Sequence, residues 1–273
     1  MNAMAWLESR SSRMKIMKSV PFIAWIVWFA TQGMVIAEEA PRVPLPRADR
    51  AEIEKYLGRG VIGKPLPAAP LEGAPQYFDL ENGAEFKYRI MHGDLKGEQR
   101  VARLTRLSRP GVKVSKWRFA DGVNQVMYGR ITPQGNLESH STETRDQGVI
   151  SRYAPAQPVL MKGMKAGQVH KTKITVTVFD LADPDKQKHS GYLKLAYSYV
   201  GTYEVQVPAG RFEAVLLRWH YKGKVGPAKV EDRQYWLMAR GTGPVAMIQQ
   251  TDVSAFLVYQ DHSKVAAALV ERL

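Results

Sequence analysis

Positively charged side chains gather in one stretch of this chain, where they could form a binding surface for anions. Residues 87–118 contain ten Lys or Arg side chains against Asp94 and Glu98, a surplus of eight positive charges. A concentrated basic surface raises the local concentration of anionic partners and speeds their association. The side chains expected to contact such an anion are Arg89, Arg100, Arg103, Arg106, Lys116 and Arg118. The alternative is a solvated outer face of two hairpins, whose charges also protect an exposed sheet edge.

Aromatic residues could supply an apolar pocket for the hydrophobic part of the same ligand. Tyr and Trp suit such a lining because they combine a large apolar area with a polar tip. The candidate pocket residues are Trp117, Tyr197, Tyr199, Tyr203, Trp219 and Trp236. The alternative is that these side chains are simply the core of a twisted sheet.

The signal for a metal site is weaker. Asp180, Asp183 and Asp185 place three carboxylates in one short segment, and carboxylate oxygens are the ligands that calcium prefers. The segment lacks the glycine and the terminal glutamate of an EF-hand, and Lys186 and Lys188 offset its charge. A polar hairpin turn is therefore the alternative to a calcium site. The six histidines do not fall at zinc-ligand spacing, and we expect no metal or other cofactor.

Catalytic motifs are absent from the sequence. It contains neither a Gly-x-Ser-x-Gly elbow nor a phosphate-binding loop. A hydrolase with a site around His220 is the only enzymatic interpretation that we retain, and His220 and Asp232 would be its candidate pair. The sequence favours a protein that is not an enzyme.

The elements that must position these side chains are predominantly strands. Residues 193–207 place Leu, Tyr and Val on one face and mostly polar residues on the other, which is the two-residue period of a half-buried strand. Gly201 interrupts the apolar face and predicts a bend or bulge. Turn signals recur every 10–15 residues or so, without helical blocks between them. We therefore predict an all-β fold with one strongly curved antiparallel sheet over 77–260, either an open barrel or a sandwich.

The segments before and after this domain are predicted not to belong to the sheet. Residues 38–76 are rich in proline and predict an extended arm packed on the sheet, with one short helix at 49–58 that Asp49 caps together with Glu52. Residues 261–273 predict a short C-terminal helix capped by Ser263.

One segment of the predicted sheet is ambiguous. In residues 97–109 the arginines recur every third residue, which fits a helix, whereas the Val and Thr content and Pro110-Gly111 favour a strand. If the segment is a strand, successive arginines point to opposite faces, and at least one lies on the inner side.

Three stretches resemble a family of uncharacterised exported bacterial β-rich proteins, which is known only as a domain of unknown function. Residues 77–88 are similar to its opening strand, and residues 201–215 contain its V-x-x-P-A-G-x-F hairpin, here Val205 to Phe212. Residues 232–245 resemble its final hairpin. The resemblance implies a curved antiparallel sheet, similar in shape to periplasmic lipoprotein carriers, and it brings no catalytic residues.

The first 37 residues predict the compartment. Lys15 and Lys18 precede an apolar run of about a dozen residues, and Ala37 is followed by two glutamates, as in a cleavable signal peptide. Translation starting at Met14 would leave residues 1–13 as a mis-annotated start. Because the chain has no cysteine, it can carry neither disulfides nor the lipid-bearing cysteine of a lipoprotein. We therefore expect a free periplasmic or secreted protein.

Export to the cell envelope limits the classes of anion that the basic residues of 87–118 could bind. Nucleic acid is normally absent from the cell envelope, so we expect an anionic lipid, lipopolysaccharide or an acidic polysaccharide. The sequence thus predicts a non-catalytic protein that binds an anionic amphiphile or an envelope glycan. The alternative function is a structural adaptor that docks an envelope protein through residues 38–76.

Overall fold

The structure is a computed structural model, and it describes residues 40–273 apart from 79–82, 109–114 and 256–258. The predicted signal peptide lies outside the described residues. The described part begins with helix α1 (Arg47–Leu57), strand β1 (Ile62–Leu66) and a short 3-10 helix (Ala74–Gln76). The strands that follow are β2 (Ala84–His92), β3 (Gln99–Arg106), β4 (Ser115–Ala120), β5 (Gln125–Ile131), β6 (Leu137–Thr144), β7 (Val149–Leu160), β8 (Val169–Asp180), β9 (Gln187–Val207), β10 (Gly210–Val225), β11 (Ala228–Ala239), β12 (Gly243–Ala255) and β13 (Tyr259–Arg272).

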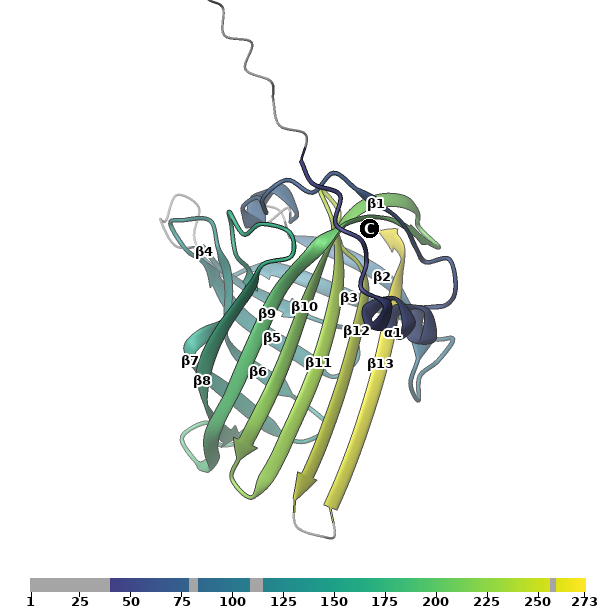
Figure 1. Cartoon of the computed structure of the whole chain (residues 1–273). Coiled ribbons are helices and arrows are strands. Elements are labelled where there is room, and N and C mark those ends of the chain that lie inside the picture. Colours follow the sequence, from purple (N-terminus) through teal and green to yellow (C-terminus); the bar gives the residue numbers. More distant parts are fainter. Residues whose placement is uncertain (1–39, 79–82, 109–114, 256–258) are drawn as a thin grey trace, which may run out of the picture. The chain divides into compact units, whose positions relative to one another are not determined.

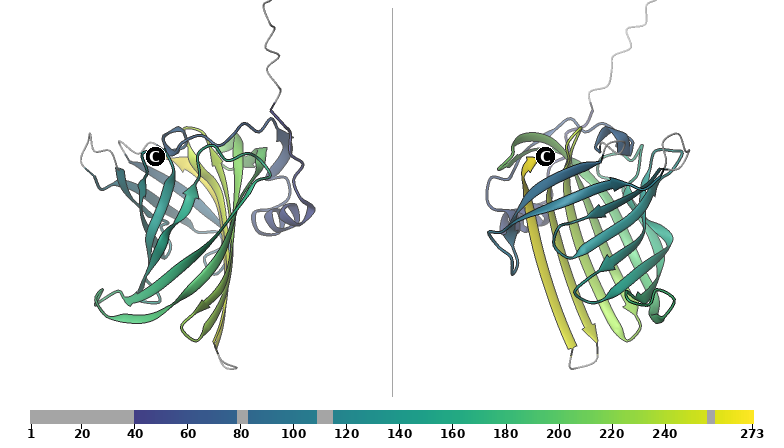
Figure 2. Two further views of the ribbon diagram at one scale, coloured as in Figure 1. Left: turned by 60° about the vertical axis from the view of Figure 1, so that its left-hand side comes forward. Right: turned by 180° about the vertical axis from the view of Figure 1, so that it is seen from behind.

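Strands β2 to β13 form a closed antiparallel barrel in which each strand pairs with its neighbours in the sequence. The last strand closes on the first, where Ala268 of β13 lies opposite Arg89 of β2. The long strands β9–β13 form one wall, and the shorter strands cross behind them (Figures 1 and 2). The predicted all-β antiparallel fold is confirmed, but the open barrel or sandwich is wrong. Closure pairs the two edges that an open sheet would leave exposed.

Strand β9 explains how the arm joins the barrel. One edge of β9 pairs with β10 along its length, whereas the other edge pairs with β8 up to Ser198 and with β1 beyond Gly201. The register between β9 and β10 shifts beside Gly201, which confirms the predicted bulge. The arm therefore contributes a strand as well as a helix, and β1 continues the pairing where β8 ends.

The predicted C-terminal helix at 261–273 is wrong, because these residues belong to β13. Ser263, the predicted cap, lies opposite Thr251 in the pairing of β12 with β13. The run from Ala266 to Leu269 is buried, since the barrel interior lies on one side of the strand and α1 packs on the other. Pairing with β12 on one edge and β2 on the other outweighs the helix propensity of the three alanines.

The predicted helix at 49–58 is present as α1, but the predicted cap is wrong. Pro46 occupies the N-cap position, and no side chain caps the helix. Asp49 lies in the first turn and points at the barrel wall, where it accepts hydrogen bonds from Arg218 and Tyr235. The pairing with Arg218 takes the place of the cap that the sequence suggests.

The ambiguous arginine-rich segment contains β3, which confirms the strand. Ala102 is fully buried in the interior, and Arg100 and Arg106 lie on the same side of β3 near its two ends. Arg103 lies on the outer side, where it forms an ion pair with Glu85 of β2. The arginines thus occupy both faces of the strand.

A chain of aromatic contacts runs through the barrel core. Phe86 contacts Phe119, Phe119 contacts Trp236, and Trp236 contacts Trp219, with ring centroids 5.5–6.5 Å apart. Tyr197 extends the series with its ring centroid 5.3 Å from that of Trp219. Offset and edge contacts of this kind are favourable beyond their buried area. These five side chains connect strands of the barrel that are far apart in the sequence.

Candidate functional site

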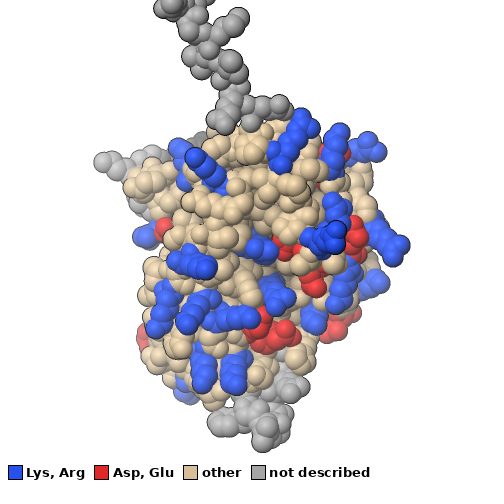
Figure 3. All heavy atoms as spheres, in the orientation of Figure 1, with Lys and Arg blue, Asp and Glu red and all other residues tan. Residues whose placement is uncertain are grey.

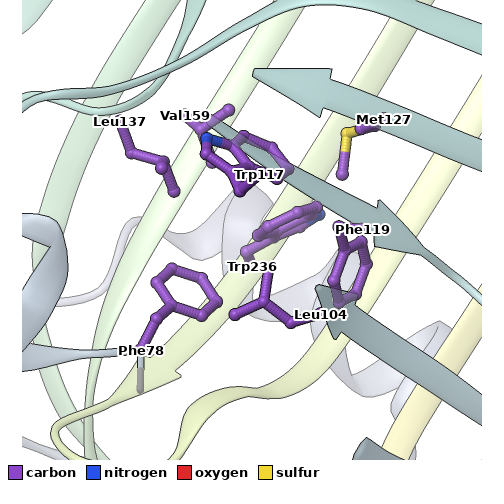
Figure 4. Close-up of a pocket in the computed structure, with 8 residues that line it drawn as sticks. All are labelled: Phe78, Leu104, Trp117, Phe119, Met127, Leu137, Val159 and Trp236. Atoms are coloured by element: carbon purple, nitrogen blue, oxygen red, sulfur yellow. The ribbon is translucent and has the colours of Figure 1, made fainter. Parts of the chain in front are cut away.

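A small apolar cavity lies among the aromatic side chains of the barrel core (Figure 4). Its volume is about 10 Å³, which is close to the minimum for a single water molecule. The side chains that line it are Phe78, Leu104, Trp117, Phe119, Met127, Leu137, Val159 and Trp236. This cavity has no room for the acyl chain of an amphiphile.

The predicted pocket residues do not surround a common space. Trp117 and Trp236 line the cavity, whereas the indole of Trp219 donates a hydrogen bond to the carbonyl of Pro158 across the barrel, at 2.7 Å. Tyr197 is fully buried against Trp219. Tyr199 donates to the carbonyl of Ala69 in the arm. In this structure these rings pack against one another and against the arm.

Tyr203, the sixth predicted pocket residue, is also fully buried. It lies on β9 opposite Pro65 of β1 and Ala214 of β10. Its burial raises the pKa of its hydroxyl to about 12. Tyr203 therefore packs where the arm strand meets the barrel.

A carboxyl group lies inside the barrel below this core. Asp232 accepts hydrogen bonds from Gln234 at 2.8 Å and from the Thr251 hydroxyl, and Gln249 lies at 3.5 Å. Burial raises the pKa of Asp232 to about 6, and these hydrogen bonds offset part of that rise. No described side chain forms an ion pair with it. The sequence analysis paired Asp232 with His220, but the structure places the two side chains on opposite faces of the wall, because His220 lies opposite Arg233 and Asp232 lies opposite Tyr221.

Two of the arginines predicted to bind an anion are neutralised by nearby acids, one on the neighbouring strand β2 and one in the turn before β3. Arg103 pairs with Glu85 at 2.6 Å, and Arg100 pairs with Glu98. Arg118 forms a hydrogen bond with Tyr128 on the adjacent strand. Arg100 and Arg103 therefore have local counterions in the barrel wall.

The remaining members of the predicted set do not form a single surface. Arg89 and Lys116 are exposed, on β2 and β4. Arg106 is half-buried on the inner side of β3. The structure therefore divides the six predicted cations between the two faces of the barrel wall.

A second group of cations, which the sequence analysis missed, lies together on the outer side of β8–β11. We call it the lysine face, and all its members are exposed: Lys171, Lys173, Lys194, Lys222, Lys224 and Lys229. Lys173 lies directly opposite Lys194, and Lys194 lies directly opposite Lys222. Lys224 lies directly opposite Lys229. Figure 3 shows basic side chains gathered over the lower part of this wall.

This arrangement of lysines costs stability. Like charges at directly opposite positions, with Cβ atoms about 5 Å apart, repel one another. Protection of a sheet edge does not explain them, because β8 to β11 are paired on both sides in the closed barrel. Neither Lys173 nor Lys194 forms an ion pair with any described residue. A row of like charges that edge protection does not explain makes the lysine face the best candidate site.

Glu231 marks the boundary of the lysine face. Its carboxylate contacts His220 and Arg233 at 2.9 Å and Lys222 at 3.3 Å. The hydrogen bond from His220 and those from Arg233 and Lys222 lower the pKa of Glu231 to about 2. His220 thus contacts Glu231 on the outer face, and it does not contact Asp232.

The three candidate calcium ligands form a turn. The Asp180 carboxylate accepts a hydrogen bond from the backbone of Ala182 and pairs with Lys188 at 3.0 Å, which lowers the pKa of Asp180. The carbonyl of Asp183 accepts a bond from the backbone of Lys186. Within the described ranges, no three His, Asp or Glu side chains converge as metal ligands would.

The arm is fixed to the barrel wall by a buried charge. Asp49 is almost fully buried, and both its oxygens lie within 2.8 Å of the Arg218 guanidinium. Glu52 accepts a hydrogen bond from Gln250 at 2.8 Å. These contacts place α1 against β10 and β12 on the side of the wall above the lysine face.

Comparisons with known proteins give little further guidance. No protein-family profile matches the chain, and no curated protein matches it significantly. A crystal structure from Bacteroides fragilis, described as an exported protein with a YmcC-like fold, aligns at 16% identity and a TM-score of 0.43. One from Parabacteroides distasonis, described as a lipoprotein, aligns at 12% identity and a TM-score of 0.35. Each alignment covers 72% of this chain and 98% of the other. Similarity at this level carries no argument about function, so the resemblance to an exported family stays a prediction.

The helices of the described residues include none that is long and apolar enough to cross a membrane.

Proposed function

We propose that this protein is an exported, non-catalytic component of the cell envelope that binds an anionic lipid or glycan through the lysine face. The anionic groups of phospholipid, lipopolysaccharide or acidic polysaccharide would pair with the ammonium groups of β8–β10. The predicted signal peptide supports the compartment, and the charge of the wall supports the class of ligand.

The observation that carries the proposal is the row of Lys173, Lys194 and Lys222. Three adjacent strands present an ammonium group at the same level, and the row ends at Glu231. A bound anion would neutralise the repulsion within this row, so that binding and stability are linked. The positive charge of this wall would attract an anion, and the bound anion would also stabilise the fold.

We propose the contact on the outer wall and not in the interior, because the apolar cavity lined by Trp117 and Trp236 is too small to enclose an acyl chain. The anionic part of an amphiphile would pair with the lysines of this wall. The predicted set that includes Arg89, Lys116 and Arg118 stays a second candidate surface. This set is the weaker candidate because Arg100 and Arg106 lie on the inner side of β3, so that its six members do not share one face of the wall.

The adaptor role of residues 38–76 stays a prediction. The contacts described for the arm are contacts with the barrel, through Asp49 and through the pairing of β1 with β9. The hydrolase interpretation also stays a prediction, and its proposed residue His220 lies beside Glu231 on the outer wall.

Binding to three probes at increasing salt tests the proposal. The probes are purified lipopolysaccharide, vesicles that contain phosphatidylglycerol, and polygalacturonate as an acidic polysaccharide. We expect binding to at least one of them at low ionic strength and a steep loss of affinity as salt screens the charges. Failure to bind any of the three at low salt would refute the proposed function.

Two matched triple variants locate the surface. Lys173→Gln, Lys194→Gln and Lys222→Gln remove three charges from the lysine face. Arg89→Gln, Lys116→Gln and Arg118→Gln remove three charges from the predicted arginine set. We expect the first variant to lose binding and the second to keep it, and the reverse pattern would assign binding to the arginine set.

A further inference from the structure

The lysine face contains an exposed aromatic ring as well as charge. Tyr192 lies on β9 two residues before Lys194, and the side chains of both residues point outward. Its side chain is 40% exposed, which is unusual for a large hydrophobic residue of this barrel. The Lys173 ammonium lies over the ring, 4.2 Å from its centroid. An apolar ring therefore stands among the ammonium groups of the patch.

The charges of the patch extend in two dimensions. Lys224 lies directly opposite Tyr192 on one side, and Thr175 of β8 lies opposite it on the other. Along the strands, Lys171 and Lys173 follow each other with one residue between them, as do Lys222 and Lys224. Residues at this spacing point to the same face about 7 Å apart, and neighbouring strands are about 5 Å apart. The cations thus form an array across four strands.

On this basis, which rests on the proposed function, we propose that the partner of the lysine face is the surface of an anionic phospholipid bilayer. A two-dimensional array of ammonium groups matches the phosphate headgroups of a membrane surface, whereas a linear polysaccharide would follow only one row of it. Tyr192 would lie among the headgroups, where tyrosine is favoured because its body is apolar and its hydroxyl is polar. Each lysine near an anionic membrane surface strengthens binding several-fold.

Co-sedimentation with vesicles tests this inference. The probes are vesicles of phosphatidylcholine alone and vesicles of phosphatidylcholine mixed with phosphatidylglycerol, with dextran sulfate as a soluble polyanion. We expect binding to the mixed vesicles, and a loss of about fivefold for each of Lys173→Gln, Lys194→Gln and Lys222→Gln. Lys64→Gln, Lys87→Gln and Arg130→Gln remove charges from β1, β2 and β5, outside the lysine face, and they should change binding little.

Replacement of Tyr192 distinguishes binding to a bilayer from binding to a soluble polyanion. Tyr192→Ser should weaken binding to the mixed vesicles and leave binding to dextran sulfate unchanged, with unaltered far-ultraviolet circular dichroism as the check on folding. Binding to dextran sulfate through the same lysines without binding to the vesicles would overturn the bilayer inference and leave the proposed function standing. Equal vesicle binding by Tyr192→Ser and the unmodified protein would overturn the role of the ring. Binding to none of these probes would overturn the bilayer inference, and absence of binding to lipopolysaccharide and polygalacturonate as well would refute the proposed function.

Discussion

Lys194 of β9 lies directly opposite Lys222 of β10 on the outer wall of the barrel. The two residues are 28 positions apart in the sequence, and Lys173 of β8 faces Lys194 from the other side. The closed sheet thus places three like charges next to one another at a cost in stability. We interpret this cost as the consequence of an anion-binding surface.

Lys194→Glu should stabilise the fold and weaken anion binding at the same time. The new carboxylate would attract Lys173 and Lys222 in place of the present repulsion, for a gain of about 1 kcal/mol in the free energy of unfolding. Urea unfolding at low salt measures this gain, and it should shrink at high salt because screening weakens both interactions. A less stable variant at low salt would show that the lysines do not repel one another as we argue.

Asp232 should make the protein more stable as the pH falls from 7 towards 4. Its pKa is about 6 in the folded state against an ordinary value of 3.8, so the folded state binds the proton more readily. Between about pH 4 and pH 6 the unfolded chain has lost this proton while the folded carboxyl keeps it, so the free energy of unfolding falls by about 2–3 kcal/mol across this range and stays level above it.

Asp232→Asn tests this assignment. The variant should be more stable than the unmodified protein at pH 7 and should lack the rise in stability between pH 7 and pH 4. Asp252→Asn is the matched control, because Asp252 lies on the outer face beside His262. If the pH dependence survives in Asp232→Asn and disappears in the control, the buried carboxyl is not its source.

Asp49→Ala should release helix α1 from the barrel wall. The substitution leaves Arg218 and Tyr235 without the carboxylate that they contact, and Arg218 is only one-third exposed. Loss of a buried charge pair costs 3–5 kcal/mol, and we expect about 2 kcal/mol here because solvent screens part of the guanidinium. Limited proteolysis should then cleave the arm faster. Glu54→Ala, which removes a surface pair with Arg50, should have little effect.

Trp236→Ala should destabilise the protein by about 3–5 kcal/mol, because it creates a large hole in the aromatic core. Trp236 contacts Phe119 and Trp219 and forms one wall of the small cavity. Leu107→Ala removes an exposed side chain and should change the free energy of unfolding by no more than about 0.5 kcal/mol. Thermal or urea unfolding measures both. An equal effect of the two substitutions would mean that the rings form a loose pocket instead of a core.

The strands were predictable because their alternation is local, whereas the closure of the barrel was not. Residues 193–207 reveal their inner face by the spacing of Leu, Tyr and Val alone. The pairing of β13 with β2 joins the two ends of the barrel sequence, and no local pattern encodes it. The alanines of β13 consequently suggested a helix.

The lysine face was missed for a related reason. The arginines of residues 87–118 were conspicuous because they are close in the sequence, although Glu85 and Glu98 neutralise two of them. The lysines of β8, β9 and β10 become neighbours only when the register of three strands is known. The only local signals were the alternating pairs Lys171 with Lys173 and Lys222 with Lys224.

The affinity of the lysine-face triple variant for vesicles containing phosphatidylglycerol at low salt is the most direct test of the central claim. With Lys173, Lys194 and Lys222 all replaced by glutamine, we expect the affinity to fall about 100-fold. The Arg89, Lys116 and Arg118 triple variant, which has the same net charge, should bind as the unmodified protein does. Equal losses in the two variants would show that only the net charge of the protein matters, and would contradict a site on the lysine face.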